Sequence, residues 1–320
     1  MPHGRERPVW PVRKPVWPPD RPDKPPDRSV QGWFLIPLLG GLVLVQSLSA
    51  LGWRAHHLPG SATALALAGG GAALPGNMAL TTVNPAHVWG LEGEAVEFGY
   101  LRMFGDLAGY SLKWQTPWRA RPVQLVLRSM AEDDIELRGD VPTAEPLAYF
   151  SARLLSATFL RGWRLGATDL GLGITLAYQR TYEYSAWGLW LSAGWQGEPL
   201  PWLRWSLTLS NLGLGEALYR ERDLVATRVG AGVAVKTPLG GSYISLDLWF
   251  DDQQGLVPCL AWQGSGQVVR FIAGVRWGTV DVLLAAGFQL AYHRWAVSYA
   301  YGYQDRALGQ PHMLSLSRRL

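Results

Sequence analysis

The sequence predicts a closed transmembrane antiparallel β-barrel of about 14 strands, and three observations lead to this fold class. Charged residues make up 17% of the 320 residues, whereas a soluble domain carries about 25%. From residue 94 to residue 320, large apolar side chains alternate with small or polar ones, which is the period of a β-strand. Aromatic side chains recur near the ends of these segments, as in the girdles of membrane barrels: Trp114, Trp118, Trp163, Trp195, Trp202, Trp277, Trp295 and Tyr303.

Residues 1–32 are expected to be a disordered, proline-rich basic tail, because nine prolines remove backbone donors and favour extended structure. The tail is either a ligand for a proline-recognising partner or a long leader region, or it follows from a start codon assigned too early. Residues 1–30 carry seven Lys or Arg and four Asp or Glu, so they contribute +3 to the formal net charge of +4. The net +1 of the other residues provides no basic field, so nucleic acid is not an expected partner.

Residues 33–50 are expected to be a signal peptide. The apolar run 33–45 has 13 residues, which suits a secretory signal better than a spanning helix of about 20 residues. Small residues follow it, so cleavage after Ser49 or Ala50 is expected, and an uncleaved anchor is the alternative. Cys259 is the one cysteine, which excludes an intramolecular disulfide and a Cys-based zinc site.

Residues 51–93 are rich in Ala, Gly and small polar residues and are expected to form a short helix, loops and turns. Asn84, Pro85 and Ala86 predict a turn before the first strand, because Pro85 fixes its own φ and the Asn84 side chain caps nearby backbone. Gating is the alternative role. No third histidine or carboxylate lies close to His56 and His57, so we expect a disordered segment there and no metal site.

The barrel is expected to begin at residue 94. Membrane strands need about 9–11 residues and a turn. The alternating segments place strands near 95–103, 106–115, 121–130, 148–161, 168–181, 186–196, 202–211, 224–237, 242–252, 256–264, 268–277, 280–293, 295–304 and 312–320. Between them, the acidic run 131–136 is expected to be an extracellular loop.

One face of these strands is large and apolar, and the other carries small or polar side chains. In one strand, for example, Leu203 and Trp205 oppose Arg204 and Ser206. Large side chains on the outside and polar ones on the inside suit a barrel in lipid. Every backbone group in lipid must be paired, so a sheet that crosses a membrane has to close on itself.

Ten charged side chains are expected on the inward face, and seven are basic: Glu97, Lys113, Arg128, Arg204, Arg228, Lys236, Asp247, Arg270, Arg276 and Asp281. A positive lumen suits the carboxylate of a fatty acid, or acidic side chains of the segment before the barrel. Ordinary ion pairing is the alternative, since a lipid-facing Arg or Lys costs about 2–4 kcal/mol at mid-bilayer. His293 is expected to face inward, either simply hydrogen-bonded or paired with Asp281.

The sequence favours no enzyme class. It contains no GxSxG or HExxH motif and no spaced metal ligands, and no cofactor is expected. The glycine runs at 171–173 and 213–215 fall within expected strands, so they are not phosphate-binding loops. The acidic run 131–136 lacks the ligand spacing of an EF-hand.

Five short motifs follow in order along the second part of the chain. Residues 67–73 (LAGGGAA) precede Asn84-Pro85-Ala86, and 209–213 (LSNLG), 227–232 (TRVGAG) and 312–317 (HMLSLS) come later. Their order and spacing resemble the PorV/PorQ-like outer-membrane proteins, which belong with the FadL-type long-chain fatty-acid transporters. The resemblance covers about residues 60–320.

The resemblance implies a barrel with a small N-terminal hatch, formed by residues 51–93, in the outer membrane of a diderm bacterium. It also implies a C-terminal strand signal for the barrel-assembly machinery, carried by Leu314, Leu316 and Leu320. Three departures are the terminal Leu320, where the family usually has an aromatic residue, Ala68 in place of Met, and the proline-rich tail.

Two functions follow from the resemblance. The barrel passes hydrophobic small molecules, or it receives secreted proteins together with the subunits of a type IX-like secretion system. A structural barrel with a plugged lumen and an inner-membrane-anchored periplasmic β-domain are the alternatives. Besides these ligands or proteins, the expected partner is outer-membrane lipid.

Overall fold

The computed structural model describes residues 53–91, 93–103, 107–119, 121–138, 144–218, 227–238, 240–251, 254–278, 282–304 and 310–320. Residues 1–52 lie outside the described residues, and with them the predicted tail, signal peptide and cleavage positions. Asp281 lies outside them as well. The predictions made for these residues stay predictions.

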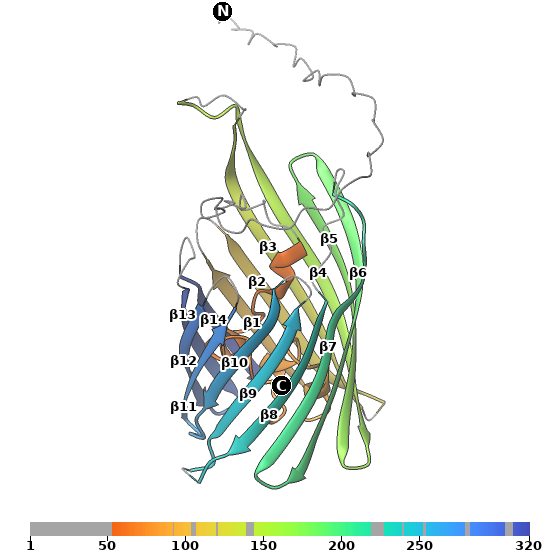
Figure 1. Ribbon diagram of the computed structural model, residues 1–320, viewed down its shortest axis with the longest axis vertical. Coiled ribbons are helices and arrows are strands. Elements are labelled where there is room, and N and C mark those ends of the chain that lie inside the picture. Colours follow the sequence, from red (N-terminus) through yellow and green to blue (C-terminus); the bar gives the residue numbers. More distant parts are fainter. Residues whose placement is uncertain are drawn as a thin grey trace, which may run out of the picture. The chain divides into compact units, whose positions relative to one another are not determined.

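The strands form a closed antiparallel barrel, which confirms the predicted fold class (Figure 1). Each strand pairs with its neighbours along the chain, and β1 pairs with β14 to close the sheet. The strands are β1 (Ala95–Arg102), β2 (Ala108–Trp118), β3 (Arg121–Leu137), β4 (Ala148–Leu165), β5 (Thr168–Thr181), β6 (Tyr184–Leu200), β7 (Leu203–Gly215), β8 (Arg228–Lys236), β9 (Tyr243–Asp251), β10 (Gly255–Gln263), β11 (Val269–Trp277), β12 (Val282–Tyr292), β13 (Trp295–Gln304) and β14 (His312–Arg319).

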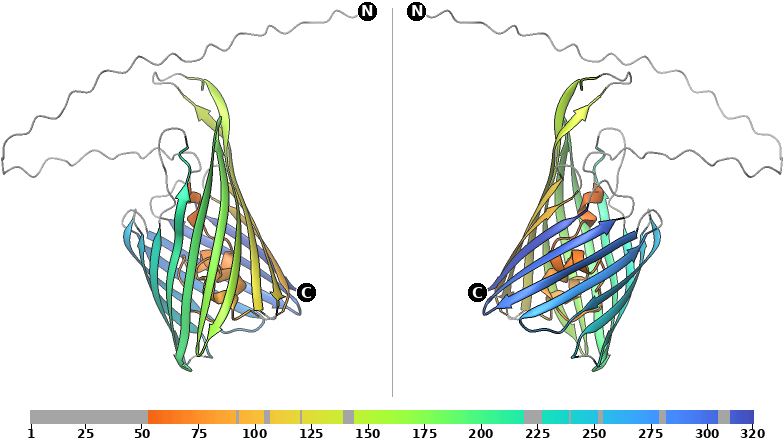
Figure 2. Two further views of the ribbon diagram at one scale, coloured as in Figure 1. Left: turned by 90° about the vertical axis from the view of Figure 1, so that its right-hand side faces the viewer. Right: turned by 90° about the vertical axis from the view of Figure 1, so that its left-hand side faces the viewer.

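The wall from β3 to β6 is taller than the rest of the barrel. Strands β3, β4 and β6 have 17, 18 and 17 residues, whereas β1 and β14 have eight each. The β3–β4 hairpin accordingly extends past the other strands (Figure 2). The acidic run 131–136 lies in this extension of β3, so its prediction as a loop was wrong. Glu132 and Glu136 pair with Ala152 and Tyr149 of β4, on either side of a register shift between Glu132 and Ile135.

The outer face of the barrel is apolar over most strands. On β5, Leu172, Ile174 and Leu176 are 46%, 51% and 49% exposed, while Gly173 and Thr175 between them are buried. Soluble proteins rarely expose contiguous apolar patches of more than a few hundred Å². A continuous outer belt of this kind suits hydrocarbon as the surrounding solvent.

Residues 53–91 lie inside the barrel, and we call them the inner segment (Figure 2). They form the 3-10 helix η1 (Trp53–His57), the helix α1 (Ala62–Ala66), and the 3-10 helices η2 (Met78–Leu80) and η3 (Pro85–Val88). None of the helices in the described part of the chain is long and apolar enough to cross a membrane.

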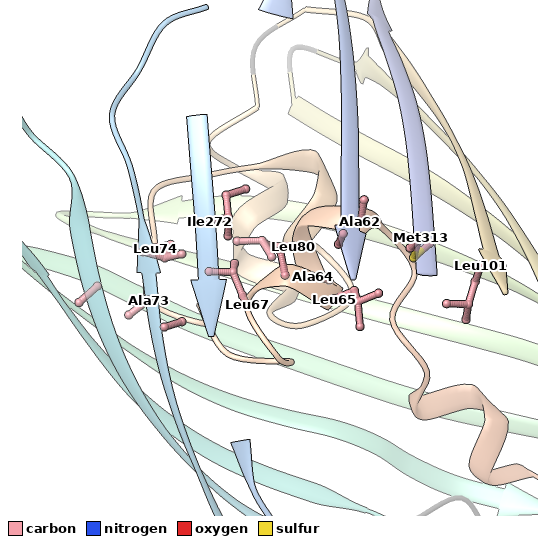
Figure 3. Packing of buried hydrophobic residues seen from close by; sticks show 14 residues of the cluster. Ala62, Ala64, Leu65, Leu67, Ala73, Leu74, Leu80, Leu101, Ile272 and Met313 are labelled. Atoms are coloured by element: carbon pink, nitrogen blue, oxygen red, sulfur yellow. The ribbon is translucent and has the colours of Figure 1, made fainter. Parts of the chain in front are cut away.

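The core lies between the inner segment and the barrel wall, not between two layers of sheet. Leu65, Leu67, Leu74 and Leu80 of the inner segment are at most 1% exposed. They cluster with inward-facing side chains of the wall, which include Leu101, Ile272 and Met313 (Figure 3). A second cluster joins Trp53 to Trp190, with ring centroids 5.1 Å apart.

Candidate functional site

The lumen filled by the inner segment is the candidate functional site, and local turns shape that segment. Ser61 caps α1, because its Oγ accepts a hydrogen bond from Ala64 N and donates one to Ala79 O. The helix ends in a glycine turn, in which Gly69 and Gly71 have φ of +83° and +90°. Glycine adopts this left-handed region without strain, so the chain reverses tightly there.

Asp247 of β9 binds this glycine turn. Its Oδ2 accepts from Gly71 N at 2.7 Å and its Oδ1 accepts from Ala72 N at 3.1 Å. Ser245 donates a further hydrogen bond to Oδ2 at 3.3 Å. Asp247 is fully buried, so these donors replace the water that a carboxylate would otherwise bind.

Basic side chains of the wall bind carbonyl groups of the inner segment. Arg128 of β3 donates to His56 O at 2.8 Å and to Leu58 O at 2.5 Å. Arg204 of β7 donates to Ala73 O at 3.1 Å and also pairs with Glu198. Residues 53–91 contain no Asp or Glu, so these basic side chains meet backbone carbonyl groups in the described part of the predicted hatch 51–93. Glu92, the one acidic residue of that predicted hatch, lies outside the described residues, so the prediction of acidic partners stays a prediction there.

Lys113 and Glu97 form a buried ion pair directly opposite each other on β2 and β1. Lys113 Nζ lies 3.0 Å from Glu97 Oε1 and also donates to Met78 O and Ala79 O at η2. The Lys113 side chain is fully buried and that of Glu97 is 8% exposed. The pair therefore has a structural task, which is to hold η2 against the wall.

The predicted turn at Asn84, Pro85 and Ala86 forms the start of η3. Asn84 Oδ1 accepts from Ala86 N at 2.9 Å, and its Nδ2 donates to Ala72 O at 2.7 Å. Gln196 of β6 donates to Ala86 O at 3.4 Å. The turn therefore joins the two halves of the inner segment and one strand of the wall.

Glycines of the wall let the inner segment lie directly against the strands. A Cβ at Gly274 of β11 would lie 2.4 Å from the carbonyl carbon of Leu67. A Cβ at Gly194 of β6 would lie 1.9 Å from Asn84 Oδ1. Contacts this short do not occur, so a larger residue at either position would move the segment.

His87 is a buried titratable group of the inner segment. It is fully buried, and its Nε2 lies 3.3 Å from Gly71 O. Burial, and then the nearby Arg204, lower the pKa of His87 to about 3. The imidazole is therefore neutral at physiological pH, and it joins η3 to the glycine turn.

A cavity of about 130 Å³ lies between the N-terminal part of the inner segment and the wall. His56 and His57 line it, together with Arg128, Arg228 and Arg276. The expectation of a disordered segment at the two histidines was therefore wrong. They belong to η1, which packs through Trp53 and Ala55 into the second core cluster.

The other predicted lumen charges differ in environment. Arg228 pairs with Asp251 on the next strand at 2.6 Å. Arg270 is half-buried on β11 and does not line the cavity. Lys236, predicted to face the lumen, is exposed because it is the last residue of β8. His293, predicted to face inward, is exposed in the turn between β12 and β13.

The residues of the predicted C-terminal signal lie on the outer face of the barrel. Leu314 and Leu316 alternate with Ser315 and Ser317 along β14, and Leu320 follows the strand. Sequence reasoning missed several uncharged polar contacts to the inner segment, among them Ser111 Oγ to Gly60 O and Ala62 N to Ser315 Oγ. Ser111 and Ser315 both fall on inward-facing positions of their strands, and this alternation was the sequence signal from which such contacts could have been predicted.

Among the described residues, no group of three His, Cys, Asp or Glu side chains could hold a metal ion. No model of a known protein family matches the chain, and no curated protein matches its sequence. Similarity to known proteins is therefore found at the level of structure.

Three solved barrels illustrate that structural similarity. The monoaromatic hydrocarbon channel CymD has a TM-score of 0.62 at 14% identity, over 81% of this chain and 97% of its own. A FadL homologue of Pseudomonas aeruginosa has a TM-score of 0.56 at 9% identity, over 81% and 98%. The Pseudomonas putida toluene transporter TodX has 0.53 at 8%, over 84% and 96%. These likenesses show a shared fold, and the resemblance to PorV/PorQ proteins stays a prediction.

Proposed function

We propose that this protein is an outer-membrane channel for hydrophobic small molecules, with the inner segment as its hatch. The observation that carries the proposal is the way in which the lumen is filled. The inner segment occupies it, yet wall side chains such as Asp247, Arg128 and Arg204 bind it through individual hydrogen bonds. Such contacts can break and re-form one at a time without unfolding the barrel.

The orientation of the barrel in the membrane supports the same proposal. Both ends of the sheet, at Ala95 and Arg319, lie on one edge, where several turns have only two residues. The opposite edge carries the β3–β4 extension and the longest connections of the barrel, which are those between β3 and β4 and between β7 and β8. Short turns are typical of the periplasmic side of outer-membrane barrels and longer loops of the extracellular side.

The names of the three similar barrels guide the choice of molecule. They are described as a monoaromatic hydrocarbon channel, a FadL homologue and a toluene transporter. A cavity of about 130 Å³ is smaller than the usual ligand pocket of about 300–1,000 Å³, so passage requires the inner segment to move. The secretion role inferred from the PorV resemblance stays a prediction.

The single cysteine offers a direct test of the hatch. A Cβ at Gly70 would lie 3.3 Å from Cys259 Cβ on β10, close to the separation of about 3.5–4.5 Å in a disulfide. Oxidised Gly70→Cys should therefore lock the segment to the wall. In proteoliposomes, we expect oxidation to reduce toluene uptake at least tenfold and reduction to restore it.

The double variant Gly70→Cys/Cys259→Ala is the matched control, because it carries the same change at Gly70 but cannot form the disulfide. Unchanged uptake by the locked barrel would show that passage does not need this part of the segment to move. No uptake by any variant, including the native protein, would favour the structural barrel with a plugged lumen.

A further inference from the structure

The outer face of β2–β5 carries two features that the channel function does not use. One is a group of arginines near the edge of the barrel at which Ala95 and Arg319 lie, and the other is an apolar hollow farther along the same strands. We propose that together they bind one phospholipid, with its phosphate on the arginines and an acyl chain in the hollow. By the orientation argued above for the channel, this lipid belongs to the periplasmic leaflet.

Arg161 is a cation on the lipid-facing side of β4. It has the phase of Leu155 and Phe159, which are 50% and 42% exposed on the outer face. Among the described residues no carboxylate pairs with Arg161, and its buried Nε has no hydrogen-bond partner there. A charged side chain on the lipid face is destabilising, so this position favours an anion supplied by the surroundings.

Two tryptophans fix the Arg161 guanidinium near the edge of the barrel. Its central carbon lies 5.1 Å from the ring centre of Trp118 and 5.6 Å from that of Trp163. Arg119 lies 5.5 Å from the same Trp118 ring, and Arg121 begins β3. We call Arg119, Arg121 and Arg161 the arginine cluster. Tryptophan favours the membrane interface, where phosphate groups lie, and guanidinium groups bind phosphate through paired N–H donors.

Two described carboxylates lie near this part of the edge, and each has another partner. Asp169 of β5 pairs with Arg164 at 2.7 Å. Glu94 accepts a hydrogen bond of 3.0 Å from the indole N–H of Trp114. No carboxylate of the described residues pairs with the arginine cluster. Its like charges repel one another, and a bound phosphate would offset that repulsion.

The hollow on the same strands has a volume of about 600 Å³. Small side chains, Ser129 of β3 and Ala157 of β4, occupy outward positions within it. Larger ones border it, among them Tyr110, Tyr178 and Trp187. A recess between large apolar side chains gives a hydrocarbon chain contacts on several sides, which a flat wall does not.

The separation of the two features matches one leaflet of a bilayer. Ala157 and Leu155, which both line the hollow, precede Arg161 on β4 by four and six residues. At about 3.3 Å per residue and a strand tilt of about 35–45°, this is about 10–15 Å along the membrane normal. Half of a hydrocarbon core of about 30 Å is about 15 Å. A chain that hangs from a phosphate on Arg161 therefore reaches the hollow.

Three probes separate the phosphate from the chain: dipalmitoylphosphatidylglycerol, dipalmitoylglycerol, which lacks the phosphate, and inorganic phosphate, which lacks the chains. Each is titrated against the delipidated full chain in detergent, and bound molecules are counted by native mass spectrometry. We expect the phospholipid to bind about tenfold or more tightly than either of the other two, because each of them makes only half of the contacts.

Arg161→Gln should weaken phospholipid binding about tenfold or more and change dipalmitoylglycerol binding by less than about threefold, because only the phosphate contact is lost. Arg153→Gln is the matched control. Arg153 lies on the same face of β4, but it pairs with Asp133 in the extension of the β3–β4 hairpin. The heat-dependent gel shift of the barrel verifies that each variant is folded.

Ala157→Phe tests the hollow without removing a charge. It fills the recess with a larger apolar side chain, so it should weaken phospholipid binding by about threefold or more while inorganic phosphate binding stays unchanged. Ala193→Phe is its control, because Ala193 occupies an outward position on β6 outside the lining of the hollow.

Equal binding of the phospholipid and dipalmitoylglycerol, or phospholipid binding that ignores Arg161→Gln, would overturn the phosphate site. Inorganic phosphate that binds as tightly as the phospholipid, or no effect of Ala157→Phe, would overturn the placement of the chain. Toluene uptake in proteoliposomes keeps the two proposals apart. Uptake without selective phospholipid binding would sink the lipid site alone, and selective binding without uptake would sink the channel alone.

Discussion

Asp247 Oδ2 accepts a hydrogen bond of 2.7 Å from the backbone N–H of Gly71, which joins a fully buried side chain of β9 to the glycine turn of the inner segment. This contact links the two parts of the molecule whose separation the proposed channel requires. A stronger hydrogen bond at this position should therefore make opening of the lumen less frequent.

Asp247→Asn should loosen this turn. The substitution removes the negative charge and one of the two acceptor oxygens, and a hydrogen bond to a charged group contributes about 1.5–3 kcal/mol. We expect hydrogen exchange of the amides in residues 69–74 to become at least tenfold faster. Asp251→Asn is the control, because Asp251 lies on the same strand but pairs with Arg228. Equal acceleration in both variants would contradict a specific role for Asp247.

Gly274→Ala should displace the inner segment. The new Cβ would lie 2.4 Å from the backbone of Leu67, which is too close, and overpacking of this kind costs about 1–3 kcal/mol. Gly109→Ala is a matched control, since its Cβ would meet its nearest neighbours at 3.5 Å, an ordinary contact. The free energy of unfolding in urea should fall in the first variant and change little in the second. A loss of the same size at Gly109 would show that the strand, and not the contact with Leu67, is responsible.

Lys113→Met should destabilise the protein strongly. It leaves the Glu97 carboxylate buried without its partner, and breaking a buried pair in this way costs about 3–5 kcal/mol. The double variant Lys113→Met/Glu97→Leu should recover much of that free energy of unfolding, because no lone charge is left. If the double variant is as unstable as the single one, the main loss comes from the contacts of Lys113 with η2.

Acid should weaken the docking of the inner segment through His87. Its pKa is about 3 in the folded protein and about 6.5 when exposed, so the unfolded state binds more protons between these values. This contribution is complete above pH 6.5 and is lost as the pH falls toward 3. Between pH 7.5 and pH 5.5, we expect the free energy of unfolding to fall by about 1.4 kcal/mol more in the native protein than in His87→Gln. Identical pH profiles would contradict this role.

Much of the barrel could be predicted from the sequence because alternate residues of a strand in lipid face two different environments. Large apolar side chains face the lipid, and small or polar side chains face the lumen. The predicted limits of 168–181 and 295–304 coincide with β5 and β13. This alternation was less informative where strands leave the membrane. At residues 131–136, polar side chains predicted a loop, yet hydrogen bonds to β4 extend β3 through them. Backbone pairing does not depend on side-chain polarity, so periodicity does not show where a strand ends in water.

The candidate site was predictable only in part. The sequence by itself determined that Arg128, Arg204 and Asp247 face inward, because charge on the lipid side is costly. Only the tertiary structure decided what they bind, since their partners are backbone groups of residues 56–73, far away in the chain. Backbone N–H and C=O groups are the same at every residue, so no sequence pattern identifies them as partners. The cavity likewise lies between η1 and several strands. Their relative placement depends on tertiary packing, which no local sequence pattern predicts.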